Sequence, residues 1–373
     1  MKRIGAITFH ASYNFGSNLQ AYALQEYVKK IAKENNKEVE YKIINYRTQL
    51  QKDIYNYRKS GSLYKRVLNK VFLNKIMNQR EANFENFMKD FFDLTEEYNR
   101  GDELQQLDFD YYISGSDQIW NLVTYDFDWA YFLDFVNKGK KISYAPSLGP
   151  KRREISKDSK DKIRNLVNEY DKISVREEGS KERLSEIVGS EKDININVDP
   201  TILLKKDDWE KIIKEEPILK GDYILFYTLR MSNERAKFLK KLSKKLKMPI
   251  VVANQSLKYD YIYGFKKQYQ SGPLEFLNLL KNAKLVISSS FHGTVFSILL
   301  NKPFYTLDGI TDDRIKNLLN ITNLENRSIS IWDNLDEKLK DAFSVDFSFS
   351  NEKINEERMK SREYLEKALD LGE

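Results

Sequence analysis

One of the chain's two histidines lies in a segment whose residue types could do chemistry. The apolar run at 285–287 predicts a buried strand, and the apolar residues at 294–300 predict a helix. Between them, the polar turn 288–293 contains three serines and His292. Hydroxyls, an imidazole and free helix N–H groups would then meet at the carboxyl edge of a strand, where open α/β sheets bind ligands. This turn is the first candidate site.

A second polar turn follows the strand predicted at 111–114. Its residues Asp117 and Gln118 could hydrogen-bond the hydroxyls of a sugar. Trp120 or Trp129 could stack on a sugar ring. The alternative is that Asp117 caps the turn and that the tryptophans fill the core. We favour the core for Trp120, whereas Asp117 and Gln118 have no evident structural purpose.

Arg176 stands between a short apolar strand and the helix predicted at 181–187. A guanidinium in this position could hold a carboxylate or a phosphate through two parallel hydrogen bonds. An ion pair with Glu177 or Glu178 is the structural alternative. The position between strand and helix favours the ligand-binding interpretation slightly.

The N-terminal segment predicts a strand at 3–9, a loop that contains Gly16, and a helix at 19–32. A strand, a glycine-containing loop and a helix form the usual loop for a phosphate ligand. One glycine is a weak signal, so we favour an ordinary turn in which Ser17 or Asn18 caps the helix.

Strands and helices alternate along both halves of the chain, which predicts an α/β protein of two Rossmann-like, doubly wound domains facing a cleft. We place the N-terminal domain at 1–195, with a basic helical insertion at 47–92. The C-terminal domain is placed at 196–350, and the residues 351–373 predict a terminal helix that packs back onto the domains.

Composition excludes several classes of protein. The chain has 373 residues, of which 41% are hydrophobic and 13% aromatic, so it is not globally disordered. It has no cysteine, which excludes disulfides and thiolate chemistry, and two histidines make a histidine-based metal cluster unexpected. The basic N-terminus leads into an apolar run too short for a signal peptide, and no stretch is long enough to span a membrane. We therefore expect a cytoplasmic location.

The formal charge of +6 is unevenly distributed. Residues 47–80 contain nine basic residues and one acid, a local charge of +8, interspersed with tyrosines and aliphatic residues. This pattern predicts basic amphipathic helices. They are either a solvated insertion or a patch for an anionic surface, such as the inner face of a membrane, a lipid diphosphate or a charged glycan.

Several motifs, in order, resemble the polysaccharide pyruvyl transferase family from about Ile4 to Arg327. They are ITFHASYNFGSNLQAYALQ, YYISGSDQIWN, KISYAPSLG, ISVREEGS, NVDPTILL, GPLEFLNLLKNAKLVISSSFHGTVFSILLNKPF and DDRIKNLL. The resemblance implies a fold similar to the GT-B glycosyltransferases. It also implies transfer of pyruvate from phosphoenolpyruvate to a saccharide diol as a ketal, in cell-surface polysaccharide biosynthesis, with no metal and no cofactor beyond the donor substrate.

The resemblance also implies roles for particular residues. The family's histidine motif falls on His292 and its SVR arginine on Arg176, so these two are the expected catalytic residues; His292 would act as general acid or base. Ser290 stands where one form of that motif has arginine, so other cations should help to hold the donor. The expected donor-binding residues are Ser290, Gly293, Thr294, Lys302 and Arg314.

The acceptor side is expected at the N-terminal loop and the second polar turn. Its candidates are His10, Asn14, Gly16, Ser17, Asn18, Asp117 and Gln118. The expected partners are phosphoenolpyruvate, a free, polymeric or lipid-linked glycan and, through 47–80, the membrane surface; no nucleic acid is expected. Two alternatives stay open, namely a GT-B glycosyltransferase that uses a nucleotide sugar and a catalytically silent glycan-binding protein.

Overall fold

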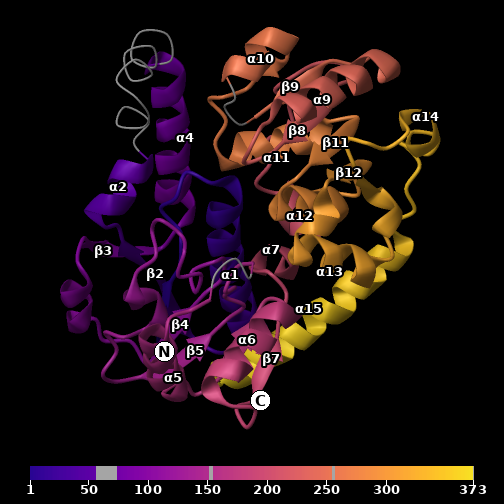
Figure 1. Cartoon of the computed structure of the whole chain (residues 1–373). Coiled ribbons are helices and arrows are strands. Elements are labelled where there is room, and N and C mark those ends of the chain that lie inside the picture. The colour runs from indigo at the N-terminus through magenta and orange to yellow at the C-terminus, as the bar shows by residue number, and fades with distance from the viewer. Residues whose placement is uncertain (56–73, 151–153, 254–256, 373) are drawn as a thin grey trace. The chain divides into compact units, whose positions relative to one another are not determined.

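A computed structural model describes residues 1–55, 74–150, 154–253 and 257–372 of the chain (Figure 1). The chain divides into two compact units. Unit 1 comprises Met1–Val71, Met88–Leu204 and Glu356–Glu373, and unit 2 comprises Phe72–Phe87 and Lys205–Asn355. No helix among the described residues is long and apolar enough to cross a membrane.

Five parallel strands form the main sheet of unit 1, in the order β3-β2-β1-β4-β5. Two further parallel strands, β6 and β7, pair with each other beside β5. The strands are β1 Lys2–Ile7, β2 Val39–Tyr46, β3 Leu94–Tyr98, β4 Tyr111–Ser114, β5 Lys140–Ser143, β6 Ile173–Val175 and β7 Ile194–Ile196. The helices are α1 Phe15–Glu34, α2 Gln49–Tyr55, α5 Lys157–Asn168, α6 Glu178–Val188 and α7 Pro200–Leu203, with the 3-10 helices η2 Gly101–Gln106 and η3 Trp129–Phe132.

Unit 2 is built on six parallel strands in the order β10-β9-β8-β11-β12-β13. They are β8 Ile224–Tyr227, β9 Ile250–Val252, β10 Lys266–Lys267, β11 Leu285–Ser288, β12 Phe304–Leu307 and β13 Ser328–Ile329. The helices are α8 Lys206–Glu210, α9 Asn233–Leu246, α10 Leu257–Tyr263, α11 Pro273–Asn282, α12 Phe291–Leu299, α13 Asp313–Thr322 and α14 Leu335–Lys338, with the 3-10 helices η4 Gly309–Thr311 and η5 Glu325–Arg327.

Two long helices contribute residues to both units. They are α4 Asn74–Phe91 and α15 Ser348–Ala368. The expected boundary at 195/196 falls in β7, whereas the compact unit continues to Leu204, because α7 packs on α1. The part of α15 from Glu356 onward belongs to unit 1.

Each sheet has a topological switch point, where the order of the strands reverses direction along the chain. In unit 1 it lies between β1 and β4, and in unit 2 it lies between β8 and β11. In open parallel sheets, ligands bind outside the carboxyl ends of the strands at such a point. The all-parallel sheets with intervening helices confirm the predicted α/β class.

The buried strands explain the formation of the two sheets. All four residues of β4, β8, β11 and β12 are buried, as expected for central parallel strands covered on both faces. Each unit has its own apolar core, one around Trp120 and Phe132 and the other around Phe226 and Leu239. Trp120 is fully buried and stacks on Phe132 at a centroid distance of 4.8 Å, so the core interpretation of this tryptophan is confirmed.

Two helices start earlier than the sequence pattern predicts. The helix α1 begins at Phe15, and its cap is Asn14, whose side chain accepts from Gly16 N, rather than Ser17 or Asn18. The helix α12 begins at Phe291, so His292 lies in its first turn rather than in a loop. In both cases, polar residues occupy buried positions in the first turn. The helical spacing of apolar residues therefore begins only after the true start of the helix. The edge strand β3 was not predicted, because two of the five residues in its sequence LTEEY are charged.

Candidate functional site

In unit 1, Arg176 lies inside a buried network of carboxylates. Its Nη1 donates to Asp199 at 2.8 Å, and its side chain also lies 3.4 Å from Glu177 and 3.9 Å from Asp117. Burial by itself lowers the pKa of Arg176, but the carboxylates of Asp199 and Glu177 raise it above its ordinary value. The guanidinium is therefore permanently charged. The ion pair with Glu177, which was the structural alternative for Arg176, is thus present. The structure adds two further partners, Asp117 and Asp199, that the sequence pattern did not indicate.

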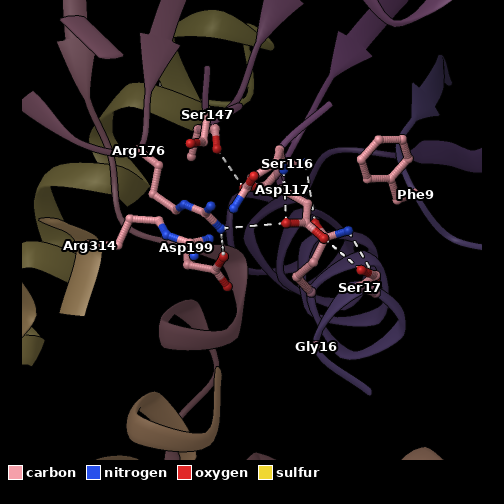
Figure 2. A network of polar contacts seen from close by, with 12 residues as sticks. Phe9, Gly16, Ser17, Ser116, Asp117, Ser147, Arg176, Asp199 and Arg314 are labelled. Carbon is pink, nitrogen blue, oxygen red and sulfur yellow. Dashed lines mark hydrogen bonds and ion pairs between the residues drawn. The ribbon is translucent and has the colours of Figure 1, made fainter. Parts of the chain in front are cut away.

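Asp117 joins Arg176 to the helix α1. Its carboxylate accepts the Ser17 hydroxyl at 2.6 Å, and Figure 2 shows it between Ser17 and Arg176. Next to it, the side chain of Thr8 joins the loop after β1 to the loop after β4, because Thr8 Oγ1 donates to Ser116 O at 2.9 Å. Asp117 is 8% exposed, so its carboxylate lies at the edge of the switch point of unit 1 with little access to bulk water.

The other acceptor-side candidates in unit 1 make hydrogen bonds to neighbouring residues of that unit. The Asn18 amide donates to the carbonyls of His10 and Ser12, which shapes the loop before α1. His10 is 1% exposed, with one ring nitrogen 3.3 Å from Thr8 O and the other 3.1 Å from the Asn45 amide oxygen. Gln118 accepts from the Asn121 amide at 2.8 Å. His10, Asn18 and Gln118 therefore each have hydrogen-bonding partners within the protein. Their contact with a ligand stays a prediction.

Asp199 belongs to the same network, although it is not among the site residues predicted from the sequence. It is 1% exposed, caps α7 by accepting from Thr201 N, and pairs with Arg176 across a separation of 23 residues. A signal was present in the sequence, since Asp199 precedes Pro200 at a predicted strand end in the motif NVDPTILL.

A small cavity of about 10 Å³ lies beside the end of β1, with room for roughly one water molecule. Thr8, Ser12, Tyr55 and Asp126 are among its lining residues. The Tyr55 hydroxyl donates to Asp126 at 2.8 Å, and burial raises the pKa of both groups. Neither residue was selected from the sequence, because each is isolated there from any motif.

In unit 2, His292 lies in the first turn of α12, directly after β11. It is 6% exposed and makes an edge contact with the Phe291 ring at a centroid distance of 5.3 Å. The loops after β11 and β8 meet here, because the hydroxyls of Ser289 and Thr228 are 2.6 Å apart. His292 therefore stands at the switch point of unit 2, as the position of its motif predicts for a ligand site.

The backbone around His292 is closely packed. A Cβ on Gly293 would lie 2.2 Å from Ser288 Oγ and 2.9 Å from the Tyr227 ring, so only glycine lets α12 approach β11 in this way. The same Ser288 hydroxyl accepts from Ser290 N at 3.0 Å. Thr294 bonds back to Ser290 O at 3.2 Å, so its hydroxyl serves the helix.

Ser290 is the N-cap residue of α12, and its side chain makes no capping hydrogen bond to the helix. The first turn of an α-helix leaves backbone N–H groups without intrahelical partners, and the helix dipole places partial positive charge there. Ser290, 7% exposed, therefore presents its hydroxyl at a place that attracts anions.

Arg314 brings a guanidinium, paired with the carboxylate of Asp312, to the same place. Its guanidinium lies over the Phe291 ring, 5.5 Å from the centroid, so Phe291 contacts both His292 and Arg314. Two hydrogen bonds to Asp312, at 2.9 and 2.6 Å, hold the guanidinium in position. The structure thus gathers His292, Ser290 and Arg314 at one end of α12.

Lys302 lies at the other end of this helix. It follows the C-terminus of α12 and precedes β12, so it stands at the amino edge of the sheet, whereas His292 stands at the carboxyl edge. Nine helical residues separate these edges by about 13 Å. Burial, together with the cations Lys206 and Lys284, lowers the pKa of Lys302. The structure therefore does not bring Lys302 to the other donor-side candidates.

Among the described residues, no group of three or more acidic or histidine side chains could hold a metal ion. The polar groups described above can bind an anion and transfer a proton. Two doubly wound units with polar groups at both switch points define the class as a GT-B-like α/β protein.

Comparisons with solved structures agree with this class. The UDP-GlcNAc 2-epimerase from Methanocaldococcus jannaschii in complex with UDP-GlcNAc and UDP is similar over 96% of this chain and 99% of its own, with a TM-score of 0.54 and 14% identity. The S. aureus MnaA–UDP co-structure is similar over 100% and 98%, with a TM-score of 0.55 and 11% identity. At these identities the likeness concerns the fold alone.

The model of the polysaccharide pyruvyl transferase family matches residues 14–309. This range covers most of the chain, and the chain therefore belongs to the polysaccharide pyruvyl transferase family. A search of curated protein sequences found no significant match.

Proposed function

We propose that this protein transfers pyruvate from phosphoenolpyruvate to two hydroxyls of a saccharide, forming a cyclic ketal. Membership of the family supports a transferase of this kind. The observation that carries the proposal is the cluster at the start of α12. There Phe291, the first residue of the helix, contacts both the buried His292 and the guanidinium of Arg314.

The cluster suits the chemical character of phosphoenolpyruvate, which carries a phosphate and a carboxylate. Helix N–H groups and the Ser290 hydroxyl can hydrogen-bond one of these anions, and Arg314 supplies the formal positive charge. One form of the family motif has an arginine where this chain has Ser290. In our proposal, Arg314 provides the charge that Ser290 cannot.

The reaction needs a group that moves protons near neutral pH. A proton is added to the methylene carbon of the enol, which becomes the methyl group of pyruvate. One saccharide hydroxyl adds to the central carbon, the phosphate leaves, and the second hydroxyl closes the ketal. The diol loses two protons. One equals the proton that was added to the methylene carbon, and the other leaves with the phosphate. His292 is the general acid or base in this proposal.

Arg176 acts as a positioning residue in unit 1. Its guanidinium is held by Asp199 and Glu177, and in turn it holds the carboxylate of Asp117 beside Ser17. Asp117 then faces the switch point of unit 1 as an acceptor for a saccharide hydroxyl. This role modifies the expectation that Arg176 grips the donor, because three carboxylates already surround the guanidinium.

The test is release of inorganic phosphate from phosphoenolpyruvate in the presence of a panel of free and lipid-linked glycans. We expect His292→Asn to lower kcat by about 10²–10⁴, the usual contribution of a general acid or base. Binding of phosphoenolpyruvate should persist. Near-normal turnover by a folded His292→Asn protein would refute the role of His292.

A matched pair of variants tests the donor pocket. Arg314→Gln and Lys302→Gln each remove one cation from unit 2. We expect Arg314→Gln to raise the KM for phosphoenolpyruvate roughly 10- to 100-fold, the contribution of a hydrogen bond to a charged group. Lys302→Gln should leave KM unchanged, because Lys302 stands at the opposite edge of the sheet. Turnover of a nucleotide sugar without any use of phosphoenolpyruvate would instead support a glycosyltransferase.

A further inference from the structure

A second segment carries about as much positive charge as residues 47–80. Residues 230–268 contain eleven lysines and arginines and two acids, Glu234 and Asp260, a formal charge of +9. The basic character of the chain therefore does not belong to one segment. This second segment runs through α9, β9, α10 and β10, which form one edge of the sheet of unit 2.

Three of the four described cations of the first basic segment have partners, and the fourth, Lys75, is exposed. Arg47 and Lys52 both pair with Glu97. Arg80 donates to the carbonyls of Tyr269 and Ser271 and lies over the Phe84 ring, and burial lowers its pKa to about 10. Most of the remaining basic residues of 47–80 lie outside the described residues, so the hypothesis of a membrane patch there stays a prediction.

The helix α9 presents a lysine face to solvent. Its inner face buries Ala236, Leu239 and Leu242, and at helical spacing the opposite face carries Lys237, Lys241 and Lys244, all three exposed. Of the other charged residues on α9, Lys245 pairs with Asp336, and Arg235 pairs with Asp308. The only acid on the helix is Glu234, in its first turn.

The helix α10 adds apolar side chains beside this lysine face. It packs against α9, where Lys240 donates to Tyr263 O at 2.9 Å and the Tyr263 hydroxyl donates to Asn233 at 2.8 Å. Next to these contacts, Tyr261 is 80% exposed and Ile262 is 59% exposed. The ammonium of Lys267, on the edge strand β10, lies 5.4 Å from the centroid of the Tyr261 ring.

We propose that this edge of unit 2, formed by α9, α10 and β10, docks on the surface of an anionic lipid bilayer. Lysines at the surface are attracted by the negative potential of anionic headgroups. Tyrosine is favoured at the headgroup level, and an exposed isoleucine gains by entering the acyl boundary. The inference is independent of the proposed function, because it involves neither His292 nor any residue of the two switch points.

The combination of groups favours a bilayer over a nucleic acid. Phosphate backbones would also attract the lysines, but a protruding aliphatic side chain such as Ile262 gains nothing from a phosphate groove. A bilayer accommodates both types of group in one plane, with ammonium groups in the headgroup layer and apolar side chains below it.

Flotation with phosphatidylcholine vesicles, with and without phosphatidylserine, tests the proposal. We expect the full chain to bind only the anionic vesicles, and to bind less as salt is added. Lys237→Gln/Lys241→Gln/Lys244→Gln should lower the partition coefficient by about 100-fold, because each lysine near an anionic surface strengthens binding roughly fivefold. Lys214→Gln/Lys220→Gln/Lys316→Gln removes the same charge from other exposed sites of unit 2 and should have little effect.

A labelling experiment tests the apolar contact. Because the chain has no cysteine, Ile262→Cys provides a single site for an environment-sensitive fluorophore. We expect a blue shift with anionic vesicles at position 262 and none at Tyr125→Cys, a residue of unit 1 that is 87% exposed. Equal loss of binding in both triple variants, no blue shift at 262, or binding of duplex DNA in preference to vesicles would overturn the proposal.

Discussion

The residue Gly293 controls how closely α12 approaches the end of β11. Its missing side chain leaves space for the Ser288 hydroxyl, which accepts from Ser290 N and so shapes the turn before His292. The position is thus constrained by packing against a neighbouring strand. Gly179, in the first turn of α6, is a helical glycine at which an added Cβ would have no atom within 4 Å, which makes it a natural control.

We expect Gly293→Ala to lower the free energy of unfolding by about 1–3 kcal/mol, the usual cost of overpacking. Gly179→Ala should raise it by about 0.4–1 kcal/mol, because alanine restricts the unfolded chain without a clash in the helix. Urea unfolding followed by circular dichroism measures both values. Equal effects of the same sign would show that α12 can move away from β11 at little cost.

The helix α15 illustrates how an element far along the sequence completes an earlier core. In unit 1, Arg358 donates to Ile202 O at 2.9 Å, Ser361 Oγ accepts from Val198 N at 3.1 Å, and the Tyr364 hydroxyl donates to Ser143 O at 2.8 Å. The side chain of Leu365 is fully buried. The helix α15 therefore hydrogen-bonds to β5, to α7 and to the segment between β7 and α7.

Three variants of α15 should separate packing from hydrogen bonding. Leu365→Ala should cost about 2–5 kcal/mol of unfolding free energy, because it leaves a cavity. Tyr364→Phe should cost about 0.5–1.5 kcal/mol, the net contribution of one hydrogen bond. Glu363→Ala removes an exposed pair with Lys367 and should change stability by less than about 1 kcal/mol. A neutral Leu365→Ala protein would show that α15 is dispensable for unit 1.

For the whole molecule, the important feature is that α4 and α15 each contribute to both units. Each unit has its own core, which includes Leu184 in unit 1 and Leu239 in unit 2. Since neither long helix can unwind without affecting both units, we infer that the two cores unfold together.

Leu184→Ala and Leu239→Ala test this inference. Each should cost about 2–5 kcal/mol and shift one common thermal transition. Hydrogen exchange measured by mass spectrometry would follow the strands β4 and β11 separately. Both strands should lose protection together in both variants, and an early opening of only one sheet would show that the units unfold independently.

The elements and the family were predictable without a structure, because their signals are local. Apolar runs bounded by polar turns predicted the strands at 3–9, 111–114 and 285–287, which are β1, β4 and β11 in the structure. The ordered motifs led to the family, which the match over 14–309 confirms. The starts of α1 and α12 were predicted several residues late, since their first turns carry polar residues.

The partners of each site residue depended on tertiary structure. Arg176 meets Asp199 and Asp117 only because separate strands end at the same edge of unit 1. Lys302 lies near His292 in sequence, but a helix carries it to the opposite edge of the sheet. The lysines of α9 become one face only through the pitch of the helix and its burial on the sheet. Local sequence patterns determine which elements form, whereas the pairing and packing of those elements decide which side chains share a site.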